Sequence, residues 1–186
     1  MDTAIGMIEV EGVGGCIAAA DAACKAAAVT LLGWTSTGGY TTVFFSGSVS
    51  AVAAGLSSGE QAARAVIDHV VAVPLTQPES VCRHYISFAP QDQPAPPGAL
   101  GWIETRGYGV HVHTNDLMVK AADVDVYSVL TVHNRVVCSL ILGPVGAVRE
   151  ALAVGRKQVA EAEHFLSSAL IPQPVPEVLQ AFGQQN

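Results

Sequence analysis

The chain has little charge, few aromatic residues and no long apolar run. Of its 186 residues 13% are charged and 6% are aromatic, although half are hydrophobic. No apolar stretch reaches the length of about 18 residues that a membrane span needs. The start, MDTAIG, shows no basic segment before an apolar core, so we expect neither a membrane anchor nor a signal peptide. A net charge of −7 argues against a nucleic-acid partner, because binding to phosphates depends on Lys and Arg.

Cysteine is scarce too, and its spacing follows no metal or disulfide pattern. Cys16, Cys24, Cys82 and Cys138 form no C-x-x-C motif, which favours small buried thiols in a reducing cytoplasm. Catalytic signatures are also missing: there is no G-x-S-x-G and no P-loop, and Gly12-x-Gly14-Gly15 is only part of a dinucleotide fingerprint. We therefore expect neither an enzyme nor a cofactor.

One stretch, by contrast, occurs twice. Ala4–Leu32 and Ala99–Tyr127 align without a gap. The matched pairs are Gly6/Gly101, Ile8/Ile103, Glu9/Glu104, Gly12/Gly107, Gly14/Gly109, Asp21/Asp116 and Lys25/Lys120. A register held over so long a stretch indicates internal duplication. The sequence predicts two domains, residues 1–88 and 99–186, joined by a Pro-rich linker at 89–98.

Each half predicts the element order β-α-β-β-α-β. Apolar residues alternate with polar ones in Ala4–Glu11, as in a half-buried strand, and an Ala-rich helix follows. The next expected elements are strands at Val29–Trp34 and Thr41–Phe45, a helix capped by Ser48 or Ser50, and a strand at Val71–Leu75. This order favours an α+β fold with helices packed on a mainly antiparallel sheet. The number of residues that separates equivalent positions of the two halves grows by one after the second strand. The extra residue is therefore expected in the hairpin between the second and third strands.

Several motifs recur in the same order in both halves. The first half carries AIGMIEVEG, AAADAACKAA and GSVSAV, and the second carries ALGWIETRG, TNDLMVKAA, GPVGAV and IPQP. Together these motifs resemble the bacterial microcompartment (BMC) shell domain. Two such domains in one chain resemble the tandem-domain, trimer-forming shell proteins, in the non-permuted order that begins with the G-x-I-E strand. The resemblance implies two ferredoxin-like domains per chain and a flat pseudohexameric tile built by three chains.

The function that this resemblance implies is structural. Many tiles side by side would form the shell of a cytoplasmic bacterial microcompartment, with a central pore in each tile. The implied partners are a homotrimer, other shell proteins of the same microcompartment, and small polar metabolites that pass through the pore. The alternative is a small-molecule-binding regulatory module on a duplicated α+β domain, with the ligand between subunits.

In this family the hairpin between the second and third strands lines the pore. It corresponds here to Thr131–Val136 in the second half, with His133, Asn134 and Arg135 at the pore. In the first half it corresponds to Thr35, Ser36, Thr37, Gly38, Gly39 and Tyr40. The first loop is small, hydroxylated and glycine-rich, which suits hydrogen bonds to a polar solute, whereas the second has no glycine. The loops differ in length by one residue, so we expect a threefold pore. The alternative, which the sequence favours if the resemblance is set aside, is that both segments are ordinary hairpin turns.

Some tandem members of the family bind an iron–sulfur cluster at the pore through a cysteine in this loop. The segment Thr35–Tyr40 has no cysteine, and Cys138 is expected in the strand beyond the second loop. We therefore expect neither a cluster nor another metal.

Lys25 and Lys120 match the family's edge lysine, which contacts the same lysine of the adjoining tile. The alternative is a helical i,i+4 ion pair with Asp21 or Asp116, and both roles can hold at once. The family's closing motif often carries an arginine where this chain has Gln77 and Gln173. This departure suggests weaker tiling or other edge contacts.

The segment His111-Val112-His113 raises the question of a metal site. Side chains two positions apart on a helix diverge, so the two histidines are poorly placed to share one ion. We expect them at the surface or at an interface. Glu9 and Glu104 occupy equivalent strand positions, which favours a structural role over an acid/base pair.

Overall fold

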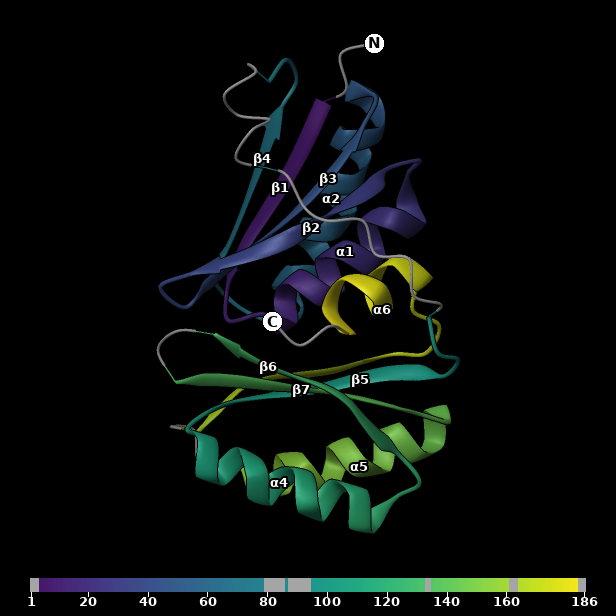
Figure 1. Ribbon diagram of the computed structural model, residues 1–186. Coiled ribbons are helices and arrows are strands. Elements are labelled where there is room, and N and C mark those ends of the chain that lie inside the picture. The colour runs from purple at the N-terminus through teal and green to yellow at the C-terminus, as the bar shows by residue number, and fades with distance from the viewer. Residues whose placement is uncertain (1–3, 79–85, 87–94, 133–134, 161–163, 184–186) are drawn as a thin grey trace.

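Each half of the chain folds into a four-stranded antiparallel sheet with two helices on one face (Figure 1). The computed structural model describes residues 4–78, 86, 95–132, 135–160 and 164–183. The first domain contains β1 (Ala4–Glu11), α1 (Gly14–Ala26), β2 (Thr30–Thr37), β3 (Tyr40–Gly47), α2 (Val49–Arg64) and β4 (Val70–Leu75). The second contains β5 (Ala99–Arg106), α4 (Tyr108–Ala121), β6 (Asp125–Val132), β7 (Val136–Gly143), α5 (Val145–Gln158) and β8 (Phe165–Ile171).

The two sheets share one topology. The strand order is β2-β3-β1-β4 in the first sheet and β6-β7-β5-β8 in the second. In each, the first strand lies between the third and the fourth and is antiparallel to both. The expected α+β fold and the element order β-α-β-β-α-β are confirmed. Ser48 caps α2, as predicted, by accepting a hydrogen bond from the backbone N–H of Ala51 at 3.2 Å. The expected linker falls largely outside the described residues.

The two halves differ by one residue at the tip of the β2–β3 hairpin. Thr37 pairs with Tyr40 and leaves a two-residue turn, whereas Val132 pairs with Val136 and leaves three residues between them. This confirms the predicted place of the extra residue. The loop expected at Thr35–Tyr40 is wrong in extent, because only Gly38-Gly39 forms the turn. Their φ angles of 62° and 92° suit a tight hairpin turn, so β2 and β3 continue almost to the tip.

Helix α1 lies between its own sheet and the sheet of the second domain (Figure 1). Val13 and Ile17, at its N-terminal end, have no exposed surface. They share one hydrophobic cluster with Leu100, Trp102 and Leu140 on the second sheet. Helices α4 and α5 cover the opposite face of that sheet, with Ile103 and Leu152 in a separate cluster. The two domains therefore share a continuous core, which fixes the orientation of α1 on the second domain.

A C-terminal helix, α6 (Pro176–Gly183), was not expected from the repeat. The Phe182 ring stacks on Trp34 of β2 at a centroid distance of 5.5 Å, and Trp34 Nε1 donates to the carbonyl of Ala181 at 2.8 Å. On the other side, the Tyr127 hydroxyl of β6 donates to the carbonyl of Leu179 at 3.2 Å. Helix α6 thus connects the two sheets. Within the described ranges, no helix is long and apolar enough to cross a membrane.

Candidate functional site

The contact between the domains centres on Glu104, a carboxylate with no exposed surface. Its Oε1 accepts the backbone N–H of Val13 at 2.6 Å, and its Oε2 accepts the backbone N–H of Gly14 at 3.4 Å. The Ser167 hydroxyl donates to Oε2 at 2.8 Å. The first N–H groups of a helix have no partner within the helix, and the helix dipole favours a negative charge there. Glu104 of the second domain therefore caps helix α1 of the first.

Two glycines allow this close approach. A Cβ at Gly12 would lie 2.6 Å from Glu104 Oε1, and a Cβ at Gly14 would collide with the Ser167 hydroxyl and the Trp102 indole. Gly12 also has a φ of 73°, in the left-handed region that favours glycine. Burial raises the pKa of Glu104 to about 7, although the hydrogen bonds from Val13, Ser167 and Gly14 act to lower it. The carboxyl group thus titrates near neutral pH inside the domain contact.

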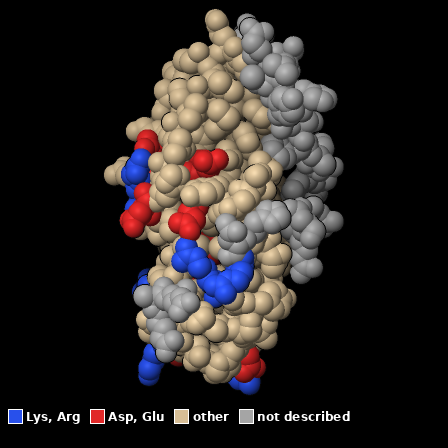
Figure 2. All heavy atoms as spheres, turned by 90° about the vertical axis from the view of Figure 1, so that its left-hand side faces the viewer, with Lys and Arg blue, Asp and Glu red and all other residues tan. Residues whose placement is uncertain are grey.

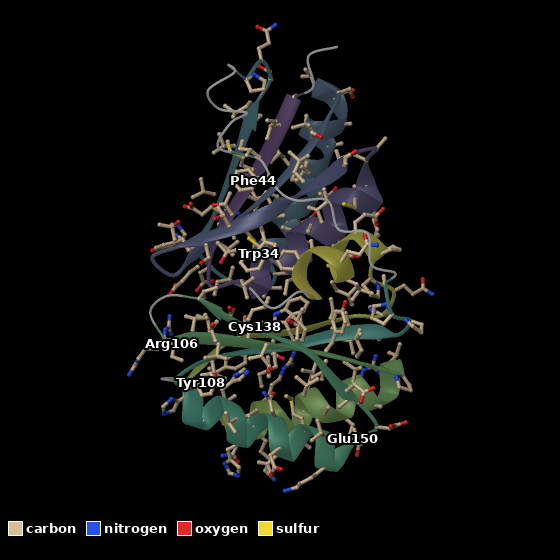
Figure 3. The ribbon with its side chains drawn as sticks, in the orientation of Figure 1. Trp34, Phe44, Arg106, Tyr108, Cys138 and Glu150 are labelled. Carbon is tan, nitrogen blue, oxygen red and sulfur yellow. The ribbon has the colours of Figure 1, made fainter. Side chains whose placement is uncertain are left out.

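The second domain has the same helix face, but nothing in the described chain covers it. Tyr108 and Val112 of α4 are 62% and 52% exposed, whereas their repeat equivalents Val13 and Ile17 are fully buried. A Cβ at Gly109, the equivalent of Gly14, would meet no atom within 4 Å. Tyr108 stands at the N-terminal end of α4, on the opposite side of the second sheet from the first domain (Figure 3).

The first domain has the matching sheet face, which is also partly open. Val71 of β4 is exposed, although its equivalent Ser167 of the second sheet is buried. Val73 is exposed as well, whereas Phe44 on the same face is buried. Glu9 is the equivalent of Glu104 but is only partly buried, and the Thr42 hydroxyl donates to its Oε2 at 3.2 Å. The chain therefore repeats the surfaces of this domain contact, and within the described residues the contact is formed once.

A second contact joins the ends of β1 and β5. Arg106 Nη2 lies 2.6 Å from Glu11 Oε1, and these two residues occupy the same position in the repeat. Backbone hydrogen bonds tie these strand ends to the hairpin tips, from Gly12 to Gly39 at 2.8 Å and from Gly107 to Arg135 at 2.9 Å. Arg106 thus lies between the domains, at the end that carries both hairpins (Figure 3). In the repeat alignment, Glu11 of the first half stands opposite Arg106 of the second half, and such opposite charges at one position could have predicted this ion pair.

A family model for the BMC domain matches residues 4–74 and again residues 99–174. The chain belongs to the BMC domain family. Its two BMC domains make it a tandem-domain microcompartment shell protein, and shell proteins of this family are structural and not enzymes. The expectation that the chain is not an enzyme is thus confirmed at the level of the family.

The chain is similar to curated shell proteins and to one solved structure. The chain is 27% identical over 182 residues to the carboxysome assembly protein CcmO of Synechocystis sp., covering 92% of this chain but 61% of CcmO. It is 40% identical over 89 residues to the microcompartment shell protein PduA of Citrobacter freundii, a match that covers 45% of this chain and 96% of PduA. A crystal structure of a microcompartment protein from Desulfitobacterium hafniense is 25% identical, with a TM-score of 0.41 and coverage of 94% of this chain and 96% of that one.

The residues expected at the pore of the BMC domains lie at the hairpin end of the molecule. The Ser36 hydroxyl donates to the carbonyl of Tyr40 at 3.0 Å, and the Tyr40 ring packs edge-on against His69 at 5.2 Å. Arg135 is exposed and has a φ of 64°. His133 and Asn134 lie outside the described residues. The pore role of this group stays a prediction.

The two expected edge lysines form the i,i+4 ion pairs that were the alternative to the edge role. Lys25 Nζ lies 2.6 Å from Asp21 Oδ2, and Lys120 Nζ lies 2.6 Å from Asp116 Oδ2. Asp21 Oδ1 also accepts the backbone N–H of Val175 at 2.9 Å, which connects α1 to the segment before α6. Because both roles are compatible, the edge role remains a prediction.

The expected position at the surface or at an interface is wrong for His111, which lies in the core of the second domain. His111 is 1% exposed, with Nδ1 at 2.8 Å from Thr105 Oγ1 and Nε2 at 2.7 Å from Ser139 Oγ. The first turn of α4 packs this side chain onto the inner face of the sheet, and burial lowers its pKa to about 4, so the ring is neutral. His113 is exposed, as expected. Among the described residues, no three His, Cys, Asp or Glu side chains are arranged to hold a metal ion.

The cysteines that the structure describes are free thiols. Cys16 and Cys138 are buried, Cys24 is partly buried, and Cys82 lies outside the described residues. Cys16 takes the place of His111 in the first domain, and its thiol donates to the carbonyl of Thr41 at 3.0 Å. Burial raises the pKa of both Cys16 and Cys138, so these thiols stay protonated and act as small core side chains.

An open groove of about 710 Å³ lies at the opposite end of the second domain from the hairpins. Its lining is mostly Pro, Gly and Ala, and among the described residues that line it Gln173 has the one side chain that can form hydrogen bonds. Small-molecule sites usually combine an apolar cavity with several convergent polar groups. This groove therefore gives no support to the alternative of a small-molecule-binding module.

Proposed function

We propose that three copies of the chain close into a pseudohexameric tile of a cytoplasmic microcompartment shell, with a pore for small polar metabolites on its axis. Family membership supports the shell role. The observation that carries the trimer is the pair of equivalent interfaces, one formed within the chain and one open. A head-to-tail contact that is repeated between identical units closes into a ring when the rotation permits.

The open interface needs a second copy of the chain because its two halves face away from each other. Helix α4 and the outer face of the first sheet are the unpaired equivalents of α1 and the outer face of the second sheet. In the next chain, Glu9 would accept the first N–H groups of α4, as Glu104 accepts those of α1. Tyr108 and Val112 would then become buried, as Val13 and Ile17 are within one chain.

The pore would be lined by the hairpin ends of the six domains. We infer that Gly38 and Gly39 form the narrow tip from each first domain, with Thr35, Ser36, Thr37 and Tyr40 behind them. Arg135, with His133 and Asn134, would contribute the longer loop of each second domain. Because the loops alternate in length, the opening would have threefold symmetry. Lys25 and Lys120 would then lie at the tile edge, facing neighbouring tiles.

The test compares two valines of equal exposure. Val112 on α4 and Val49 on α2 are both 52% exposed, but only Val112 lies on the proposed interface. We expect the native chain to have a mass of three times 19.2 kDa, about 58 kDa, by native mass spectrometry, and to form two-dimensional sheets in electron micrographs. Val112→Asp should give a folded monomer, because it places a charge in an apolar contact, and Val49→Asp should stay trimeric.

Two results would overturn the proposal. One is a native chain that remains monomeric and never forms sheets. The other is a Val112→Asp variant that trimerises as well as Val49→Asp does.

A further inference from the structure

Glu11 and Arg106 form an unusual kind of contact between the domains. They end equivalent strands: Glu11 pairs with Tyr40 at the start of β3, and Arg106 pairs with Val136 at the start of β7. Their ion pair of 2.6 Å therefore joins one repeat position to itself. The capping contact is different, since Val13 of the first domain meets Glu104, whose own equivalent is Glu9.

A contact between equivalent positions locates the axis that relates two domains. When one body is rotated onto another, equivalent points separate in proportion to their distance from the rotation axis. Only residues close to that axis can touch their own equivalents, whereas residues farther out meet different positions. Glu11 and Arg106 thus lie close to the axis that this contact reveals, and the hairpin tips bound to Gly12 and Gly107 lie beside them.

Both side chains have capacity for a second partner. The ion pair joins Glu11 Oε1 and Arg106 Nη2, while a carboxylate has two acceptor oxygens and a guanidinium has five N–H donors. The Glu11 side chain is 38% exposed and that of Arg106 is 33% exposed. On the face that carries the hairpins, acidic groups of the upper domain lie next to basic groups of the lower one (Figure 2).

We propose that Glu11 of each chain binds Arg106 of a second copy as well as its own, so that three chains close a ring of six alternating charges around the axis. This inference rests on the trimer proposed above and names the partner of its axial surface. The ring also sets the order of the domains. Two first domains side by side would place two Glu11 carboxylates together, and like charges in contact disfavour the wrong neighbour.

The test exchanges the charges of Glu11 and Arg106 and measures the dissociation constant of the trimer. Glu11→Arg leaves six basic side chains around the axis and Arg106→Glu leaves six acidic ones, whereas the double variant restores alternation. We expect each single variant to raise the dissociation constant of the trimer by roughly 10- to 100-fold at low salt, and the double variant to return it close to the native value. The effect should shrink as salt rises, because exposed charges are screened over about 8 Å at physiological ionic strength.

The readout is the ratio of monomer to trimer by native mass spectrometry over a dilution series, with thermal unfolding of the monomer as the folding control. If the pair acts only within one chain, the single variants will lower monomer stability but leave trimer dissociation unchanged, which overturns the ring while the trimer stands. A native chain that never forms trimers overturns both. A double variant as weak as the single variants also contradicts the ring.

Discussion

Glu104 Oε1 lies 2.6 Å from the backbone nitrogen of Val13, so a carboxylate of one domain caps the first helix of the other. The equivalent Glu9 faces outward and is only partly buried. Two residues that the repeat makes equivalent therefore have different environments, and this difference is open to experiment.

Glu104→Ala should destabilise the chain by about 2–4 kcal/mol, because it leaves the buried N–H groups of Val13 and Gly14 without an acceptor. The matched control is Glu9→Ala, whose partly exposed site should change the free energy of unfolding by less than about 1 kcal/mol. Urea unfolding of the monomer measures both. Equal losses in the two variants would show that Glu104 does not cap α1.

Stability should also depend on pH through Glu104. The fold raises the pKa of this carboxyl from 4.5 to about 7, so the folded chain binds the proton more tightly than the unfolded chain does. The resulting stabilisation is full below about pH 4.5 and is lost as the pH rises through 7, with a total on the order of 3 kcal/mol. Glu104→Gln should remove this dependence.

A second buried group acts in the opposite direction. Burial lowers the pKa of His111 to about 4, so its contribution is present above pH 6.5 and is lost as the pH falls toward 4. The measurement is therefore the difference between native and variant unfolding free energies from pH 5 to pH 8. Glu150→Gln, at an exposed position of α5, is the control for the Glu-to-Gln substitution itself. A Glu104→Gln profile that parallels the native one contradicts the prediction.

Helix α6 should depend on its aromatic anchor. Phe182→Ala removes a fully buried ring that stacks on Trp34, and such a deletion typically costs about 3–5 kcal/mol. We expect the emission of Trp34 to shift to longer wavelength, measured in a Trp102→Phe background because Trp102 belongs to the same hydrophobic cluster as Phe182. Phe182→Leu keeps most of the apolar volume and should lose less. Unchanged emission in Phe182→Ala would mean that α6 does not cover Trp34.

The edge lysines should affect tiling but not trimer formation. We expect Lys25→Asp combined with Lys120→Asp to keep the mass of about 58 kDa, three times 19.2 kDa, yet to abolish sheets in electron micrographs. Lys157→Asp, on the exposed side of α5, serves as the charge control and should still form sheets. If sheets persist in the double variant, the two lysines have no role at the tile edge and serve only in their ion pairs with Asp21 and Asp116.

Much of the fold follows from local patterns in the sequence. The alternation in Ala4–Glu11 gave the bounds of β1, and the change in repeat offset placed the extra residue in the hairpin. The same local evidence underestimated β2 and β3, because the turn chemistry of Gly38-Gly39 allows the strands to run almost to the tip. It missed α6 because that helix follows the closing Ile171–Pro174 motif, beyond the strands and helices that the repeat predicted.

The site was less predictable, because it depends on how the domains pack. His111 lies inward because the start of α4 presses it against the sheet, a fact that helix spacing alone does not contain. The burial of Glu104 arises from a helix in the other domain. A repeat identifies equivalent residues, but the packing decides which copy of a position is covered.

The packing of α1 on the second sheet also has a consequence for the life of the chain before assembly. Trp102 and Leu140 become buried as soon as the chain folds. This face of the second sheet can therefore be as apolar as a protein interior. On the counterpart face of the first sheet, Phe44 is buried but Met7 and Glu9 are only partly buried within one chain. Duplication therefore allows the outer face of the second sheet to be buried within the chain. The equivalent face of the first sheet is partly exposed, so it must stay compatible with water in every newly made chain.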